Sequence, residues 1–408
     1  MVVLHAARSG THSTAENLDP RVPARILLLS IVNPEMERNG AATVTRGLLK
    51  VLRSPLLHAD VDCVPVRIAP RKWHRWAQAR SLLESLVSEL PSKAIFLKSR
   101  EFRDNVEARI RRKAYDLVVL NGSDLLWISG FLPPSIPRIL VAHNIEHLLF
   151  RCQIQNLSRL LEPLNGLLRK DCQRLEEFER EGIRQTRNVI FLSGEEAAYA
   201  HGFCADLRSV AMPPLFDYEP RFQPRKKSGA VLEIGYVGNL GWWPNQLGFR
   251  WFVDRVLPYV KSPIRLHLFG RGGGRKWLGD RRVINHGLVE SMEQIWATCD
   301  FLICPAVSSG GISVKLAEAV YNGMPVLATT EAARGLGLEQ DPALLFLDQP
   351  AEWVDLLNSP AARDLGKRRV SAKIAKRFAV DTHKEALQQF IKGVISAASV
   401  KHAKHESD

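Results

Sequence analysis

Short aliphatic runs alternate with longer helix-like stretches along most of this chain. Continuously apolar runs of this length are typical of strands that are covered on both faces, and their alternation with helices indicates parallel sheets flanked by helices. In the first half we expect strands at residues 26–31, 61–68, 117–120, 139–142 and 189–192. The pattern therefore predicts an α/β protein.

The pattern stops after Met212 and then restarts. Four prolines and the basic triplet Arg225-Lys226-Lys227 mark a linker there. A second series of expected strands follows at residues 234–237, 265–269, 283–286, 301–304, 326–328 and 344–346. We therefore predict two similar α/β domains. The expected parts are a loose extension (1–23), an N-terminal domain (24–212), a linker (213–230), a C-terminal domain (231–382), a helix that is a candidate to return to the N-terminal domain (383–400) and a polar tail (401–408).

Composition narrows the class of protein. With 408 residues and 46% hydrophobic composition the chain can bury two cores, which excludes a single small binding module. No apolar run approaches the roughly 20 residues of a membrane-spanning helix, and the first 23 residues lack the apolar centre of a secretory signal. The six scattered cysteines match no zinc or Cys-x-x-Cys spacing, which favours a reducing, cytoplasmic setting.

The net charge of +13 attracts phosphate groups, whether in nucleotides, lipid headgroups or nucleic acids. Charge alone does not choose among these partners. The sequence contains no helix-turn-helix, zinc-finger or RNA-recognition motif, so we do not expect a nucleic-acid partner.

Two strand ends in the first half carry candidate ligand-binding residues. Asn39, Gly40 and Ala41 open a helix after the first strand, where small residues and unpaired N–H groups suit an anion, although a plain turn explains them equally well. The strand at 139–142 runs into His143-Asn144-Ile145-Glu146-His147. Open α/β sheets bind ligands at such carboxyl ends. His143 could also simply cap the loop, and the two histidines lie outside the His-Glu-x-x-His zinc pattern.

Glycine-rich loops follow two strands of the second half. Gly238 and Asn239 follow the first of these strands, and Gly270-Arg271-Gly272 follow the next. Their spacing matches neither the Rossmann fingerprint nor a Walker motif, which argues against a dehydrogenase or a P-loop protein.

The most specific segment spans residues 308–329. Gly310 and Gly311 open a helix that could hold a diphosphate at its N-terminus, and Lys315 adds positive charge one turn later. Glu318 lies on the same helical face, where a carboxylate suits the paired hydroxyls of a ribose. A simple salt bridge between Lys315 and Glu318 is the competing explanation.

This segment, the loop at residues 235–245 and the strand ending at His143 together resemble the bacterial GT4-like (group 1) retaining glycosyltransferases of the GT-B superfamily. The likeness extends over about residues 25–390. It implies an α/β GT-B fold, in which two Rossmann-like domains face each other across a central cleft. Family members commonly carry a Glu, seven residues and a second Glu. Here Glu318 matches the second, Gly310 stands at the first, and Ser313 stands where a related subgroup has Arg.

The resemblance also implies site roles. The implied catalytic residues are His143, which faces the transferred sugar, Lys315, which holds the diphosphate, and Glu318, which holds the donor ribose. The implied donor-binding set also contains Gly238, Asn239, Arg271, Gly310, Gly311, Ile312 and Ser313, and the acceptor or cleft set contains Asn39, Gly40, Ala41, Asn144 and Glu146. The family's basic pair after the first C-terminal strand has no clear counterpart, for which Arg271 or Lys276 could compensate.

The implied activity is a hexosyltransferase of class EC 2.4. It would transfer a sugar from a nucleotide-diphosphate donor to a glycan or polyprenyl-linked acceptor, with retention and without a metal or other obligatory cofactor. We expect a role in cell-surface or exopolysaccharide synthesis at the cytoplasmic face of the membrane. A non-catalytic GT-B-like scaffold or binding protein is the competing hypothesis, because Gly310 replaces the first Glu.

A basic and aromatic segment is the candidate membrane contact. It contains Arg71, Lys72, Trp73, Arg75 and Trp76, and a second basic stretch covers residues 98–113. One face of the predicted helix collects apolar side chains, namely Trp76, Ala79, Leu83, Leu86, Val87 and Leu90. This composition suits an anionic lipid surface, but the same face could instead pack on the N-terminal domain.

Overall fold

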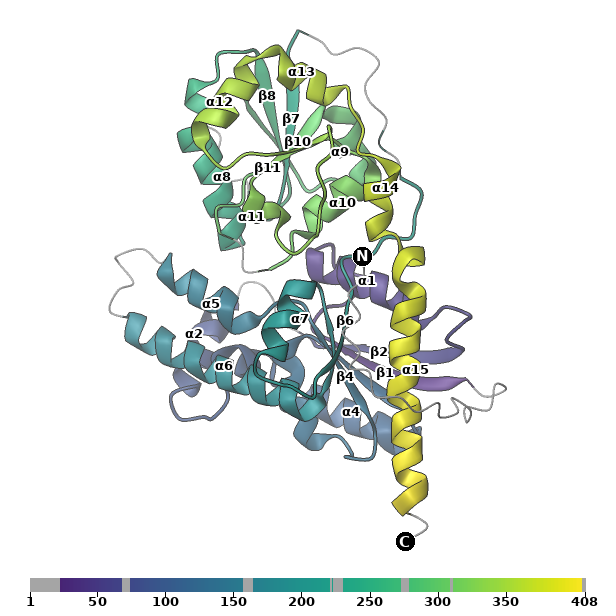
Figure 1. Ribbon diagram of the computed structural model, residues 1–408. Coiled ribbons are helices and arrows are strands. Elements are labelled where there is room, and N and C mark those ends of the chain that lie inside the picture. The colour runs from purple at the N-terminus through teal and green to yellow at the C-terminus, as the bar shows by residue number, and fades with distance from the viewer. Residues whose placement is uncertain are drawn as a thin grey trace. The chain divides into compact units, whose positions relative to one another are not determined.

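A computed structural model describes residues 23–67, 74–156, 164–220, 222, 230–272, 279–308 and 311–405. The chain forms two compact units (Figure 1). The N-terminal unit comprises residues Met1–Leu215 together with His383–Asp408, and the C-terminal unit comprises Phe216–Thr382. The chain therefore leaves the N-terminal unit once and later returns to it.

The N-terminal unit contains a parallel sheet in the order β2-β1-β3-β4-β5-β6. Its strands are β1 (Ala24–Ser30), β2 (Ala59–Pro65), β3 (Leu117–Asn121), β4 (Arg138–Ala142), β5 (Asn188–Phe191) and β6 (Arg208–Ala211). All five residues of β3 are buried, as its continuous apolar pattern predicts. The chain connections leave β1 and β3 in opposite directions across the sheet. These two neighbouring strands therefore form a topological switch point.

Helices cover this sheet (Figure 1). They are α1 (Gly40–Leu52), α2 (His74–Glu84), α3 (Ser92–Leu97), α4 (Arg100–Arg112), α5 (Glu146–Gln155), α6 (Asn165–Thr186) and α7 (Gly194–His201), with the 3-10 segment η2 (Ser123–Phe131). The last helix, α15 (Val380–His405), belongs to this unit from His383 onward. The amide of its Gln388 donates a hydrogen bond to the hydroxyl of Ser54, just after α1.

The C-terminal unit repeats the architecture with a sheet in the order β12-β11-β10-β7-β8-β9. Its strands are β7 (Leu232–Val237), β8 (Ile264–Phe269), β9 (Val283–Gly287), β10 (Phe301–Cys304), β11 (Val326–Ala328) and β12 (Leu344–Phe346). The helical segments are α8 (Trp243–Arg255), η4 (Leu257–Tyr259), α9 (Met292–Thr298), α10 (Val314–Asn322), α11 (Thr330–Ala333), α12 (Pro350–Asn358), α13 (Pro360–Gly366), α14 (Ala372–Ala375) and η6 (Lys376–Phe378). Here the switch point lies between β7 and β10.

All eleven strands expected from the sequence are present, with ends that differ by a few residues. The sequence analysis missed β6, an edge strand of 4 residues in which none is buried. Such a strand has no continuous apolar run, so the pattern could not reveal it. Among the described residues, no helix is long and apolar enough to cross a membrane.

Candidate functional site

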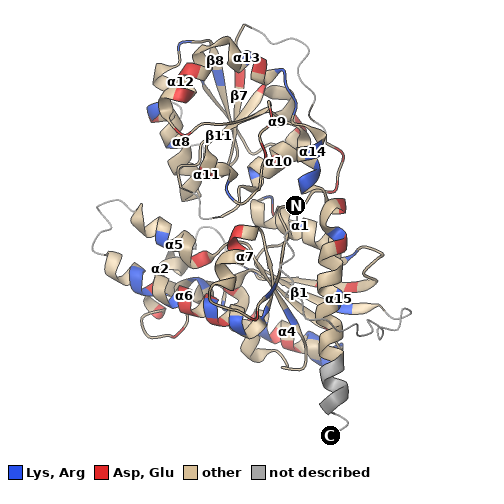
Figure 2. Cartoon of the chain, viewed as in Figure 1, with Lys and Arg blue, Asp and Glu red and all other residues tan. Residues whose placement is uncertain are grey.

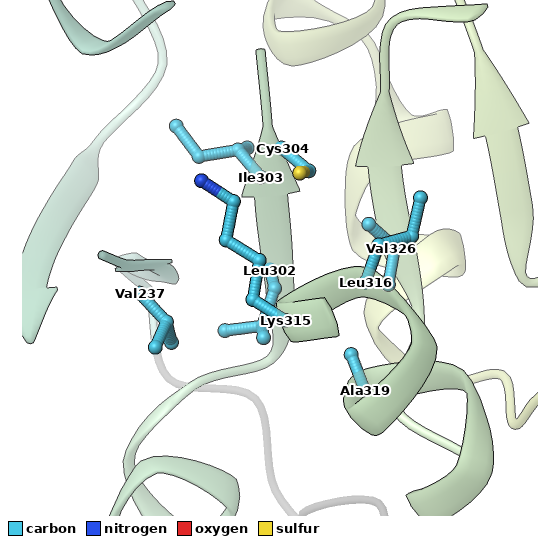
Figure 3. A pocket seen from close by; sticks show the side chains of 8 residues that line it. All are labelled: Val237, Leu302, Ile303, Cys304, Lys315, Leu316, Ala319 and Val326. Carbon is cyan, nitrogen blue, oxygen red and sulfur yellow. The ribbon is translucent and has the colours of Figure 1, made fainter. Parts of the chain in front are cut away.

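Lys315 lies at the switch point of the C-terminal unit. A small pocket there is lined by Val237 from β7, by Leu302, Ile303 and Cys304 from β10, by Lys315, Leu316 and Ala319 from α10, and by Val326 from β11. Figure 3 shows the Lys315 side chain extending from the start of α10 past Leu302 toward Ile303. The ammonium group is thus held at the edge of the sheet where parallel α/β domains bind their ligands.

The Lys315 ammonium is held by neutral groups. Its Nζ donates to Oδ1 of Asn245 at 2.7 Å and lies 4.9 Å from the ring centroid of Tyr236. The Tyr236 hydroxyl in turn donates to the carbonyl of Asn245 at 2.9 Å. Among the described contacts Lys315 forms no ion pair with Glu318, so the competing salt-bridge explanation for this pair fails. A cation that contacts a neutral amide and a ring, and no carboxylate of the described residues, retains its capacity to attract an anion.

The loops after β7 and β8 fit together backbone to backbone. Gly238 N donates to the carbonyl of Phe269 at 2.9 Å, and Leu240 N donates to the carbonyl of Arg271 at 2.7 Å. Gly270 has φ +122°, and a Cβ there would lie 2.2 Å from the carbonyl oxygen of Gly238. Only glycine fits this position, because both the backbone conformation and the close approach exclude a side chain.

The other predicted donor residues surround this switch point. Gly238 and Asn239 follow β7, but the Asn239 side chain is engaged in its own turn, where Oδ1 accepts from Gly241 N at 2.9 Å. Arg271 is exposed on the loop after β8. Gly311, Ile312 and Ser313 lead directly into α10. The predictions for Gly310 and Lys276 fall outside the described residues.

His143 lies at the end of β4 and is only 7% exposed. Its Nε2 is 2.7 Å from Oδ1 of Asn121, whose amide donates to Ser30 Oγ and to Thr45 Oγ1. Because both amide hydrogens of Asn121 are used, its Oδ1 must accept, so the His143 proton sits on Nε2. Burial lowers the pKa of His143 to about 4. The ring is therefore neutral at neutral pH, with Nδ1 unprotonated.

Glu146 belongs to a buried polar cluster beside His143. Its Oε2 pairs with Nζ of Lys93 at 2.5 Å, and its Oε1 accepts from Asn144 Nδ2 at 2.8 Å. Burial opposes the charge on Glu146, but the Lys93 ammonium overcomes this effect and lowers the pKa of Glu146. The predicted acceptor residues Asn144 and Glu146 are thus joined by a hydrogen bond, and Glu146 also forms an ion pair with Lys93.

A second carboxylate organises the start of α5. Glu179 of α6 is fully buried and accepts hydrogen bonds from the backbone N–H groups of Glu146, at 3.0 Å, and His147, at 3.2 Å. It also accepts from His147 Nδ1 at 2.7 Å, while His147 Nε2 contacts the hydroxyl of Tyr199 at 2.9 Å. The His147 side chain is therefore engaged within the N-terminal unit, and Glu179 caps the start of α5.

Two further acids next to this cluster resist ionisation. Burial and the charges of Glu146 and Glu179 raise the pKa of Glu196 to about 8. Burial and Glu146 raise the pKa of Asp124 to about 7, although Lys93 lowers it. Oδ1 of Asp124 and Oε2 of Glu196 are buried without a hydrogen-bond partner among the described residues. Strongly shifted acids at a strand end are typical of functional sites.

Asn39 has a structural role. Its Oδ1 accepts from the N–H of Ala42 at 2.9 Å and caps α1, and its Nδ2 donates to Glu37 at 2.8 Å. Gly40 and Ala41 form the first turn of that helix. One N–H group at the start of α1 is thus already hydrogen-bonded within the protein. This is expected for a plain strand-to-helix turn, which the sequence allowed as the alternative to an anion site.

The sequence analysis missed several residues of this cluster, namely Lys93, Asn121, Asp124, Glu179 and Glu196. Most of them come from other segments of the chain and meet only in the folded sheet. A signal existed for Glu196, because Ser193 and Glu196 follow a strand with the spacing of a helix cap, and Ser193 Oγ accepts from Glu196 N at 3.2 Å. Among the described residues, no three His, Cys, Asp or Glu side chains are arranged to hold a metal ion.

Comparison with known proteins finds a family similarity in the C-terminal unit. The family model for Glycosyl transferases group 1 matches residues 232–359, which include β7, β8, β10 and α10. The predicted resemblance to the group 1 glycosyltransferases is confirmed. A search of curated proteins found no significant match.

Solved structures show the same fold along nearly the whole chain. Sucrose-phosphate synthase from Thermosynechococcus elongatus aligns with TM-score 0.66 and 16% identity, over 92% of this chain and 100% of that one. HepE from Anabaena, in complex with UDP and glucose, aligns with TM-score 0.59 and 14% identity, over 91% and 100%. TarM aligns with TM-score 0.59 and 9% identity, over 91% and 99%. The predicted GT-B fold, with its two Rossmann-like domains, is confirmed.

Gly270→Ala tests the backbone fit of the two glycine loops. We expect the midpoint of thermal unfolding to fall by several degrees, because alanine at positive φ costs more than about 1 kcal/mol even without a clash. The matched control is Gly279→Ala in the same unit, where an added Cβ meets no atom within 4 Å. Equal melting of the two variants would contradict the loop geometry.

Glu196→Gln tests the buried acid cluster. A carboxyl whose pKa rises to about 8 on folding stabilises the folded state at low pH, and this contribution is lost as the pH rises from about 4.5 to 8. Glutamine does not titrate, so we expect the variant to gain several degrees relative to wild type between pH 5 and pH 8. Glu195→Gln, at an exposed neighbour, is the control. A pH-independent difference would refute the shifted pKa.

Proposed function

We propose that this protein is a glycosyltransferase that moves a sugar from a nucleotide-diphosphate donor onto a glycan or lipid-linked acceptor. The observation that carries the proposal is the Lys315 ammonium at the switch point of the C-terminal sheet, inside the segment that matches the group 1 family. The complexes of HepE with UDP and with UDP-glucose make a UDP-sugar the first donor to test.

Lys315 would act on the departing diphosphate. Cleavage of the bond between the sugar and the diphosphate builds negative charge on the leaving oxygen, and a fixed cation stabilises that charge without reorganisation. The start of α10 at Val314 supplies backbone N–H groups at the same place. In the retaining reaction that the resemblance implies, the leaving phosphate itself takes the proton of the acceptor hydroxyl, and no metal is required.

The N-terminal unit would contribute residues that bind the transferred sugar and the acceptor. Neutral His143 presents an unprotonated Nδ1 that can accept a hydrogen bond from a hydroxyl of the transferred sugar, because Asn121 holds its Nε2 proton. Asn144 precedes α5 and Glu146 begins it, and the charges of Lys93 and Asp124 interact with Glu146. Such a set of donors and acceptors suits a polyhydroxylated acceptor in cell-surface glycan or exopolysaccharide synthesis.

A non-catalytic scaffold is the second candidate. It is favoured by Gly310, which stands where family members commonly carry the first Glu of the donor motif. The two candidates differ in whether they cleave a nucleotide-sugar. A scaffold can bind a nucleotide-sugar, but it does not release the nucleotide from the sugar.

Lys315→Ala tests the enzyme hypothesis. We expect the loss of the cation to reduce turnover of the best donor about a hundredfold or more, as for other fixed donors to a developing anion. Release of nucleoside diphosphate from UDP-, GDP- and ADP-sugars measures this. The control is Lys261→Ala at an exposed lysine of the same unit. Donor binding to wild type without any release would favour the scaffold.

We also propose that the surface around α2 contacts an anionic membrane at the cytoplasmic face. Trp76 is 74% exposed, Leu83 63% and Val87 93%, whereas Ser81 and Ser85 are buried. These three side chains therefore do not pack on the N-terminal unit, whereas Leu90 packs against its hydrophobic core. The predicted helical face is also shorter than expected, because α2 ends at Glu84, before Leu86, Val87 and Leu90. Figure 2 shows basic residues along α2, α4 and α6. Arg71, Lys72 and Trp73 fall outside the described residues, and Arg75 lies in the first turn of α2.

The triple variant Trp76→Ser, Leu83→Ser, Val87→Ser tests this surface. Each apolar side chain that inserts into lipid contributes roughly 1.5 kcal/mol or more, so we expect binding to vesicles of phosphatidylglycerol and phosphatidylcholine to weaken at least tenfold. The control is Met36→Ser, Leu56→Ser, Leu288→Ser, which removes apolar side chains that are exposed elsewhere. Equal sedimentation of wild type and the test variant would remove the hypothesis.

A further inference from the structure

Tyr218 lies just after the point at which the chain enters the C-terminal unit at Phe216. This entry point is tied to the exit point by backbone hydrogen bonds. Phe216 N donates to the carbonyl of Phe378 at 2.8 Å, and Val380 N donates to the carbonyl of Phe216 at 3.0 Å. The segment that carries Tyr218 is therefore anchored where both connections to the N-terminal unit begin.

Aromatic packing fixes this segment on α10. The ring of Phe216 stacks on that of Tyr321 with centroids 5.0 Å apart, and the ring of Tyr218 meets Tyr321 edge-on at 5.3 Å. The Tyr321 hydroxyl donates to the backbone carbonyl of Tyr218. Both the backbone and the ring of Tyr218 are thus positioned by residues of the helix that carries Glu318.

The neighbouring hydrogen bonds show from which group the Tyr218 hydroxyl accepts and to which group it donates. Nδ2 of the fully buried Asn322 donates to the carbonyl of Glu318 at 2.8 Å and to the Tyr218 hydroxyl at 3.1 Å. The Tyr218 oxygen is therefore an acceptor toward Asn322, and its own hydrogen points to Glu318 Oε1 at 3.2 Å. Burial, together with the charge of Glu318, raises the pKa of Tyr218, so the phenol remains a donor at all ordinary pH values.

We propose that Tyr218 is a positioning residue that orients the Glu318 carboxylate toward the paired hydroxyls of the donor ribose, and that it links this carboxylate to the connection between the two domains. The inference rests on the proposed function, because it assumes a nucleotide at α10. A carboxylate fixed by a donor on one oxygen has less rotational freedom to lose when it accepts from a diol.

Tyr218→Phe keeps the ring against Tyr321 and removes only the hydroxyl. Calorimetric titration of the full-length protein with UDP, GDP and ADP, each paired with its 2′,3′-dideoxy analogue, separates ribose recognition from phosphate recognition. We expect the variant to bind the ribonucleotide about tenfold more weakly and the dideoxy analogue as wild type does, since a hydrogen bond to a charged group is of that order. Tyr259→Phe, at an exposed tyrosine of the same unit, is the control.

The outcomes distinguish the inference from the proposed function. If wild type bound none of the three nucleotides, the proposed function would fail and this inference with it. If wild type bound one of them and Tyr218→Phe weakened the ribonucleotide and its dideoxy analogue equally, or neither, the role of Tyr218 alone would be overturned. Thermal unfolding of the variant close to that of wild type excludes general misfolding as the cause of weaker binding.

Discussion

Parallel strand pairing is the constraint on which the remaining structure depends. It places the carboxyl ends of all six strands of each sheet along one edge, and the loops that leave this edge carry the candidate chemistry of each unit. In the C-terminal sheet, the paired strands β7 and β10 form the switch point, and the Lys315 ammonium lies there. In the N-terminal sheet, β3 ends in Asn121 and β4 is followed by His143, and these two side chains hydrogen-bond to each other.

The two units satisfy their polar groups in different ways. In the N-terminal unit many polar side chains hydrogen-bond to one another, as when Asn121 connects Ser30, Thr45 and His143, and when Glu179 caps α5. Asp124 Oδ1 and Glu196 Oε2 are exceptions among the described residues. Such networks specify one arrangement of neutral and charged groups before any ligand arrives. In the C-terminal unit Lys315 is held by an amide and a ring, and no carboxylate of the described residues pairs with its charge. The first arrangement suits recognition of hydroxyl groups, and the second suits attraction of an anion.

The sequence revealed most of the fold, because burial on both faces forces a strand to be continuously apolar. It also singled out Lys315, Glu318 and His143, because they follow a strand or lie in the first turns of a helix, and their roles stay predictions. It missed β6, where no residue is buried. It missed Lys93 and Glu179 as well, because these side chains reach Glu146 and His147 from positions that are 53 and 32 residues away. Contacts of this kind are set by the tertiary packing, and no local pattern encodes them.

The C-terminal unit is an insertion within the N-terminal unit, since the chain returns to the first unit only at His383. During synthesis on the ribosome, the N-terminal unit therefore emerges incomplete and must wait for α15, which is translated after the inserted unit. The inserted unit, in contrast, is complete at Thr382 and has adjacent ends at Phe216 and Ala379. Vectorial folding thus favours completion of the second unit before the first, and a premature stop before α15 would leave the first unit without its final helix.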